Sequence, residues 1–233
     1  MQHLFWLSPQ KSARMPAMIK AVIYDLDDLM VNSYEIHVRA TNLLLKRHGV
    51  DASNISEKVN RRFVGMRISD ILKTIVSHLN LNIDFESFYK ERNRIFIDLV
   101  KKELKPMPGL NESLSYYRQR EFKIALASSG TKKYIEMVLD RFKIKEYFDV
   151  IISGDHVKHG KPNPEIYKLT LNKLGVKPSE AVVLEDAEVV IESAKGVGCY
   201  CIAVANPNTP IQDLSKADKV INSLNEINTV KLT

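Results

Sequence analysis

The sequence predicts an α/β fold, a doubly wound parallel sheet with helices on both faces and a helical module inserted after the first strand. Short, uninterrupted apolar runs recur along the chain, which is typical of strands buried on both faces. In the second half these runs alternate with stretches of helical periodicity, as in parallel sheets. Residues 33–104, by contrast, contain no strand-like run.

Six apolar runs are predicted as strands. They cover 19–25, 122–128, 149–153, 181–186, 199–205 and the short run 217–221. Helices are predicted between the later strands, over 132–142, 164–175 and 188–198. The second of these helices begins with Pro164, which suits a first helical turn, and ends at Gly175.

The long insertion is predicted to be helical throughout. Its periodic segments are 33–48, 56–63, 68–79 and 84–104, and prolines 106 and 108 suggest a semi-rigid joint where the chain returns to the sheet. We therefore predict a core domain of residues 18–32 and 105–233 and a helical cap domain of residues 33–104. Residues 1–17 are interpreted as an extension ahead of a start at Met18, with a weak organellar transit segment as the alternative.

Composition excludes several classes of protein. The chain has 233 residues, of which 45% are hydrophobic and 27% charged, which is ordinary globular usage. It lacks an apolar run of about 18 residues, so we expect no membrane span. The net charge of +6 is mild and its basic residues are scattered, so we expect no nucleic-acid partner. Cys199 and Cys201 suit buried positions in a reduced, cytoplasmic protein, which we expect to be monomeric.

Charged and hydroxyl side chains follow four of the predicted strands. The set comprises Asp25, Asp27 and Asp28 after the first strand, Ser128 to Thr131 after the second, Lys161 beyond the third, and Glu185 and Asp186 after the fourth. Ligands of open parallel sheets bind outside the carboxyl ends of the strands. These side chains are therefore expected to converge on one pocket.

The chemistry of this set indicates a phosphoryl group bridged by Mg²⁺. Carboxylates crowded into one pocket repel one another unless a cation lies between them, and oxygen ligands suit Mg²⁺. Serine hydroxyls and backbone N–H groups at a helix start bind anions, and a lysine adds a positive charge. Alone, each residue also has a plainer interpretation, because Asp and Ser often form turns or helix caps and Lys161 could be a solvated loop residue.

The joint pattern assigns a role to each residue. We expect Asp25 to attack phosphorus and form an aspartyl-phosphate, and Asp27 to act as general acid and base. Asp186 is a predicted metal ligand, with Glu185 as a further ligand or an orienting partner. Ser128, with Ser129 beside it, and Lys161 are expected to hold the phosphoryl oxygens.

Four ordered motifs resemble those of the haloacid dehalogenase (HAD) superfamily, in its subgroup with a helical cap. They are YDLDDLMVNS (24–33), IALASSG (124–130), SGDHVKHGKPNPEIY (153–167) and LEDAEVVIESAKGVG (184–198). The resemblance spans residues 18–228 and implies a Rossmann-like core, Mg²⁺ and the same roles for Asp25, Ser128, Lys161 and Asp186. It also places Asp27 where a backbone carbonyl binds the metal, and the second carboxylate favours phosphate esters over dehalogenation.

The chain departs from the family pattern at four positions. Asp28 stands where Gly is usual, Asn32 replaces a common Asp, and Ala187 and Val190 stand where Ser and Gly are common. Asp28 could point to solvent or change the affinity for metal. These departures keep open a non-catalytic relative that only binds a phosphorylated ligand.

The predicted cap offers three candidate substrate contacts. His37 resembles a β-phosphoglucomutase position that contacts the acid/base, although it could also be a helix-surface residue. Arg67 lies in a turn, GMRI, that is similar to one in hexose-phosphate phosphatases, and Arg92 could reach a second phosphate or be solvated. We expect a phosphatase of a small phosphorylated metabolite, with a sugar phosphate favoured and a phosphosugar mutase as the alternative.

Overall fold

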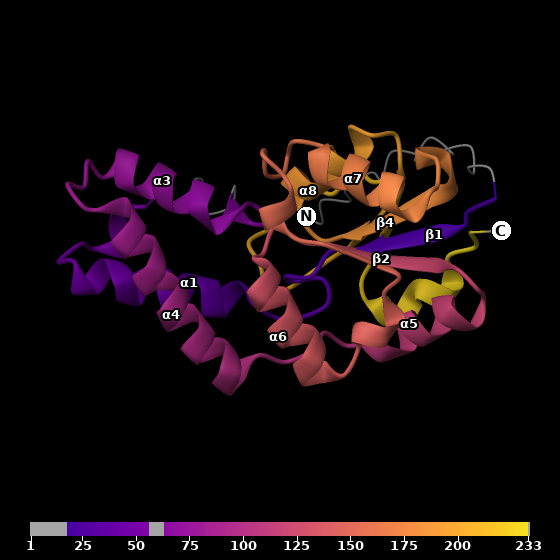
Figure 1. The fold of residues 1–233 in the computed structure, drawn as a ribbon, viewed down its shortest axis with the longest axis horizontal. Coiled ribbons are helices and arrows are strands. Elements are labelled where there is room, and N and C mark those ends of the chain that lie inside the picture. Colours follow the sequence, from indigo (N-terminus) through magenta and orange to yellow (C-terminus); the bar gives the residue numbers. More distant parts are fainter. Residues whose placement is uncertain (1–17, 56–62, 233) are drawn as a thin grey trace, which may run out of the picture.

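The computed structural model describes residues 18–55 and 63–232, and within them the predicted parallel sheet is present (Figure 1). Its strands are β1 (Ala21–Tyr24), β2 (Lys123–Ala127), β3 (Val150–Ile152), β4 (Ala181–Glu185), β5 (Tyr200–Val204) and β6 (Lys219–Ile221). All five strand pairs are parallel, and the order across the sheet is β3-β2-β1-β4-β5-β6. This is the doubly wound α/β fold that the sequence predicts.

Helices cover both faces of the sheet. On one face lie α7 (Glu165–Leu174) and α8 (Glu188–Lys195), and on the other lie α5 (Leu110–Gln119) and α6 (Lys132–Phe142) (Figure 1). Alternate strand residues point to opposite faces, so Val22 and Tyr24 pack into one apolar core and Ala21 and Ile23 into the other. Both cores are apolar because both faces are covered.

Most predicted helices have close counterparts. The structure adds α5, which the sequence patterns did not indicate, and the helix predicted over 56–63 lies almost wholly outside the described residues. Cys199 and Cys201 are buried in the core beneath α7 and α8 and are not disulfide-bonded. No helix in the described ranges combines the length and the apolar character needed to cross a membrane.

Three helices stand beyond the carboxyl ends of the strands. They are α1 (Tyr34–Arg47), α3 (Ile68–His78) and α4 (Phe85–Glu103), in the indigo to purple part of the chain (Figure 1). Together with the turn before α3 they are called the helical group below. The two chain segments that join them to the sheet lie side by side, with the amide of Asn32 bonded to the carbonyl of Lys105 (3.0 Å) and that of Met107 to Met30 (2.9 Å). The exact domain boundaries stay a prediction.

The strand order places a crevice at the centre of the sheet. From β1 the chain proceeds to β2 and β3 on one side and returns to β4 on the other. The loops that leave β1 and β4 therefore diverge, and they leave a crevice above their carboxyl ends. Asp25 follows β1 directly, and Glu185 ends β4, so the sheet delivers both to this crevice.

Candidate active site

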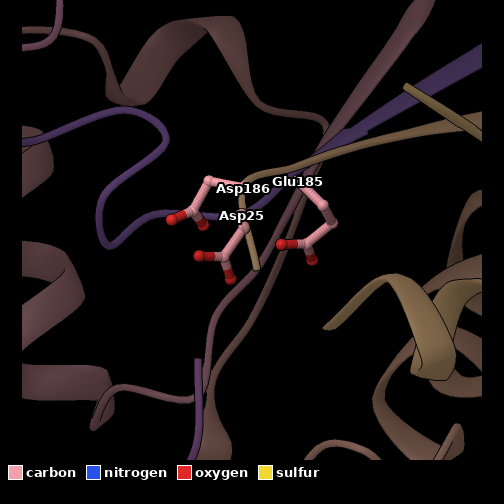
Figure 2. A group of neighbouring side chains, drawn as sticks. All are labelled: Asp25, Glu185 and Asp186. Carbon is pink, nitrogen blue, oxygen red and sulfur yellow. The ribbon is translucent and has the colours of Figure 1, made fainter. Parts of the chain in front are cut away.

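Three carboxylates meet where β1 and β4 end. One oxygen each from Asp25, Glu185 and Asp186 lies within 4.8 Å of the others, and all three residues are buried. Figure 2 shows the three side chains grouped at these strand ends. The parallel register fixes this grouping, since Tyr24 and Leu184 are paired neighbours and the acids come directly after them.

Lys161 is bonded to two of these carboxylates. Its Nζ donates to Oδ1 of Asp25 (2.7 Å), Oε1 of Glu185 (3.0 Å) and the carbonyl of Ala127 (3.1 Å). Burial alone would lower the pKa of Lys161, but Asp25 and Glu185 raise it, so the ammonium stays charged. It is not the solvated lysine of the plainer interpretation, since only 2% of its surface is exposed.

The remaining negative charge of the cluster suits a divalent cation. Glu185 also accepts from the Tyr167 hydroxyl, whereas its Oε2 and Oδ2 of Asp186 are buried without a hydrogen-bond partner among the described residues. Burial raises the pKa of Glu185 to about 8 despite Lys161, and burial with neighbouring carboxylates holds that of Asp186 well above its usual range. A cation held by these oxygens would relieve the cost, and an all-oxygen donor set is what Mg²⁺ prefers.

Asp27 points away from this cluster. Its Oδ1 accepts a hydrogen bond from the Tyr134 hydroxyl (2.6 Å) and lies 3.7 Å from Nε2 of His37. Burial raises the pKa of Asp27, but His37 and, to a smaller extent, Tyr134 lower it. Their combined effect is larger than that of burial, so the pKa of Asp27 is lowered overall. The side chain is therefore held beside the carboxylate cluster and outside it.

Arg92 fixes the orientation of His37. Its Nη2 lies 2.7 Å from Nδ1 of His37 and 3.1 Å from the His37 carbonyl, and it is buried rather than solvated. A guanidinium can only donate, so Nδ1 must accept and the proton of neutral His37 is assigned to Nε2, facing Asp27. Burial lowers the pKa of His37, which favours this neutral form. The chain Arg92–His37–Asp27 thus links α4 and α1 to the sheet.

The loop after β2 carries the two predicted phosphate-binding serines, Ser128 and Ser129. Ser128 is fully buried and its Oγ accepts from the amide of Gly130 (3.0 Å), while the cap of α6 is Thr131. Ser129 donates to the carbonyl of Gly65 (2.9 Å), so it joins the core to the helical group. Neither serine serves as the helix cap of the plainer interpretation.

A cavity of about 410 Å³ opens above these residues. Asp25, Asp27 and Ser129 lie at one end of its lining, and the helical group supplies most of the rest, including His37 and Arg92. Arg67 is not part of the lining, because its Nη2 donates to the carbonyl of Val157 (3.1 Å). The structure therefore brings together the predicted site residues, apart from Arg67, around or just beneath one cavity.

Asp28 is buried and does not point to solvent. It adopts a left-handed backbone (φ 66°), and its Oδ1 accepts from the amides of Ser33 (2.9 Å) and Tyr34 (2.7 Å) at the start of α1. Burial, with Asp27 nearby, raises its pKa to about 7. The departure from glycine thus adds a helix cap at the joint to α1.

Two other departures face the turn before α3. Gly65 (φ +79°) lies so close to α8 that a Cβ added there would fall 2.2 Å from Cγ2 of Val190 and 3.5 Å from Cβ of Ala187. Val190 therefore occupies space that only a glycine at position 65 leaves free. The remaining departure, Asn32, has a buried Oδ1 without a hydrogen-bond partner among the described residues.

The family model for haloacid dehalogenase-like hydrolases matches residues 22–204, which include the carboxylates, Lys161 and the inserted helices. The chain belongs to this family. The predicted family is therefore confirmed, as is the prediction that the chain is an enzyme, a HAD hydrolase.

The proteins similar to this HAD hydrolase include named phosphatases. A phosphorylated carbohydrates phosphatase of Thermotoga maritima is 33% identical over 184 residues, which cover 77% of this chain and 82% of that protein. The crystal structure of CbbY from Rhodobacter sphaeroides in complex with phosphate has a TM-score of 0.79 at 26% identity, over 90% of this chain and 96% of that one. A β-phosphoglucomutase from Clostridium difficile also has a TM-score of 0.79, at 27% identity over 90% and 93%.

Proposed function

We propose that this HAD hydrolase is a Mg²⁺-dependent phosphatase of a small phosphorylated metabolite, a sugar phosphate by preference, and that it works through an aspartyl-phosphate. The observation that carries the proposal is the cluster of Asp25, Glu185 and Asp186 with Lys161 bonded to two of its members. The Thermotoga maritima relative, named for phosphorylated carbohydrates, supports the substrate class.

In the first step, Asp25 attacks phosphorus and the bond from phosphorus to the leaving oxygen breaks. The leaving alkoxide takes a proton from Asp27, so Asp27 must bind a proton before this step, although His37 and Tyr134 lower its pKa in the free enzyme. Lys161 and the amides of the loop after β2 offset the charge on the phosphoryl oxygens. Mg²⁺, when bound by Asp25, Asp186 and Glu185, would supply further positive charge against the transferring group.

In the second step, Asp27 accepts a proton from water, and the oxygen of that water attacks phosphorus. The bond between Asp25 and phosphorus breaks, inorganic phosphate leaves, and both carboxyl groups return to their starting forms. The same residue thus gives and recovers one proton per turnover. His37 and Tyr134 hold Asp27 for both steps, since they contact its Oδ1.

Phosphate release from a panel of sugar phosphates, with Mg²⁺ or with EDTA, tests the proposal. We expect release that needs Mg²⁺. A folded protein that releases phosphate from none of the esters would contradict it. Asp25→Asn should abolish turnover, because an amide is a poor nucleophile, and survival of biological activity in this variant would favour a binding protein instead.

A phosphosugar mutase is the second candidate, favoured by the similarity to β-phosphoglucomutase and by the contact between His37 and Asp27. The two differ in whether the aspartyl-phosphate passes to water or to a sugar hydroxyl. Feeding β-glucose 1-phosphate separates them, since a mutase forms glucose 6-phosphate without loss of phosphate.

We further propose that the enzyme acts as a cytoplasmic monomer without nucleic-acid or membrane partners. Support comes from Cys199 and Cys201, which are buried as free thiols. Burial raises the pKa of both thiols, which keeps them protonated and inert.

A further inference from the structure

The cavity above Asp25 has one wall that is wholly apolar. Helix α3 presents Ile68, Ile71 and Ile75, and the turn before it adds Val64 and Met66. The three isoleucines recur at helical spacing, so they form one stripe along the helix. Of the described residues from 63 to 75, none that lines the cavity has a hydroxyl, amide or charged group.

Helices α1 and α4 supply both polar and apolar side chains to the cavity. Beside Val38, Phe96 and Ile97 they contribute Asn42 and Asn93, whose side-chain amides form no hydrogen bond with the described part of the chain. Thr41 and His37 lie beside them but are engaged with Arg92. Two free carboxamides can donate to and accept from the hydroxyl groups of a ligand.

The lining of the cavity constrains the alcohol part of the substrate, which lies against it. A hydroxyl pressed against the isoleucine stripe would lose its water and gain no partner, which is unfavourable. A carbon surface there would gain by leaving water. Arg67, at the start of α3, donates to the carbonyl of Val157 and is not part of the cavity lining where it could meet a second phosphate.

We propose that the substrate is a phosphorylated sugar or polyol that carries an apolar substituent, which lies on the isoleucine stripe of α3 while its hydroxyl edge faces Asn42 and Asn93. This inference rests on the proposed phosphatase activity and narrows its substrate class. An unsubstituted hexose phosphate would leave the stripe without a partner and would be a weaker substrate.

Matched pairs of esters test the inference, because the leaving alcohol is the same within each pair. They are glucose 6-phosphate with phenyl β-glucoside 6-phosphate, and ribose 5-phosphate with phenyl β-riboside 5-phosphate. We expect kcat/KM to be about tenfold or more higher for the substituted member of at least one pair, the range that one apolar contact surface provides. Equal or lower values for the substituted members of both pairs would overturn the inference while leaving the phosphatase intact.

Variants of α3 locate the effect. Ile71→Asn should remove the preference within the pair, whereas Val76→Asn, at a half-buried position of the same helix outside the cavity lining, should keep it. If Ile71→Asn loses its circular dichroism signal, Ile68→Asn replaces it. Equal preference in the stripe variant and the control would overturn the assignment to α3. Failure to hydrolyse any ester, p-nitrophenyl phosphate included, would remove the proposed function and this inference with it.

Discussion

The phenol of Tyr134 donates a hydrogen bond to Oδ1 of Asp27 over 2.6 Å, and Nε2 of His37 approaches the same oxygen to 3.7 Å. Tyr134 is the hydrogen-bond donor that holds Oδ1 of Asp27, since His37 lies beyond hydrogen-bond distance. Tyr134 comes from α6 in the core, whereas His37 comes from α1 among the inserted helices. The tyrosine therefore holds the acid/base from within the core, independently of the inserted helices, and we assign it a positioning role.

Tyr134→Phe should impair the chemical step where a proton must be delivered to the leaving group. We expect kcat to fall by about tenfold or more for sugar phosphates, whose alkoxides need a general acid, and by less for p-nitrophenyl phosphate, which needs none. Steady-state kinetics with both esters measure the difference. Tyr147→Phe, which removes a hydroxyl bonded to Ser115 outside the site, is the control. An equal loss with both esters would contradict the positioning role.

The contact between Gly65 and Val190 should limit how closely the helical group can approach the core. Gly65→Ala places a Cβ against Val190 and strains a backbone at φ +79°, so we expect a lower kcat/KM and an unfolding temperature lower by about 2–4 °C. Adding Val190→Ala removes the clashing methyl group and should restore part of the activity. If the double variant is as slow as Gly65→Ala alone, the steric explanation fails and only the backbone strain remains.

Lys161→Met should destabilise the protein as well as inactivate it. The substitution leaves Asp25 and Glu185 buried without their counter-charge, and breaking a buried pair in this way costs about 3–5 kcal/mol. Urea unfolding measured in EDTA gives the free energy. Lys158→Met, at an exposed position of the same loop, should change it by less than about 0.5 kcal/mol. A cost as small as the control's would mean that the carboxylates are protonated and need no lysine.

Much of this fold could be predicted because parallel strands and covering helices leave simple periodic signals. The convergence of Asp25, Lys161 and Asp186 followed from strand ends meeting at one edge of a sheet. Helix α5 was missed, since LNESLSYYRQ directly follows the proline joint and buries only a narrow face. Within it, Leu110, Ser113 and Tyr117 pack inward at helical spacing, a signal that could have revealed the helix.

Side-chain contacts between separate elements could not be predicted in the same way. Tyr134 fits the apolar periodicity of its helix, and only the position of Asp27 in space gives its hydroxyl a partner. Arg67 and Arg92 are similar in sequence terms, yet one bonds to the core and the other to His37. These hydrogen-bond partners depend on how separate elements pack against one another, which the periodicity within one segment does not encode.

The carboxylate cluster sets the sign of the stability change with pH when no cation is bound. Burial raises the pKa of Glu185 from 4.5 to about 8 and that of Asp28 from 3.8 to about 7. Between the unfolded and the folded pKa of such a carboxyl group, the folded state holds its proton and the unfolded state does not. The free energy of unfolding therefore falls as pH rises through this interval, and the loss is complete above the folded pKa. Asp27, whose pKa is lowered, titrates below this window, and His37, whose pKa is lowered from 6.5, opposes the trend only below about that pH, as one group against several carboxyls.

We therefore expect the free energy of unfolding in EDTA to fall between about pH 5 and pH 8, and Mg²⁺ to restore more of it at pH 8 than at pH 5. A bound cation favours the charged carboxylates, so its gain grows as they lose their protons. Urea unfolding at several pH values, in EDTA and in MgCl₂, measures both slopes. Asp186→Asn should flatten the dependence, while Glu192→Gln, an outer-surface change at the Lys216 pair, should preserve it. A gain from Mg²⁺ that is the same at every pH would place the cation away from this cluster.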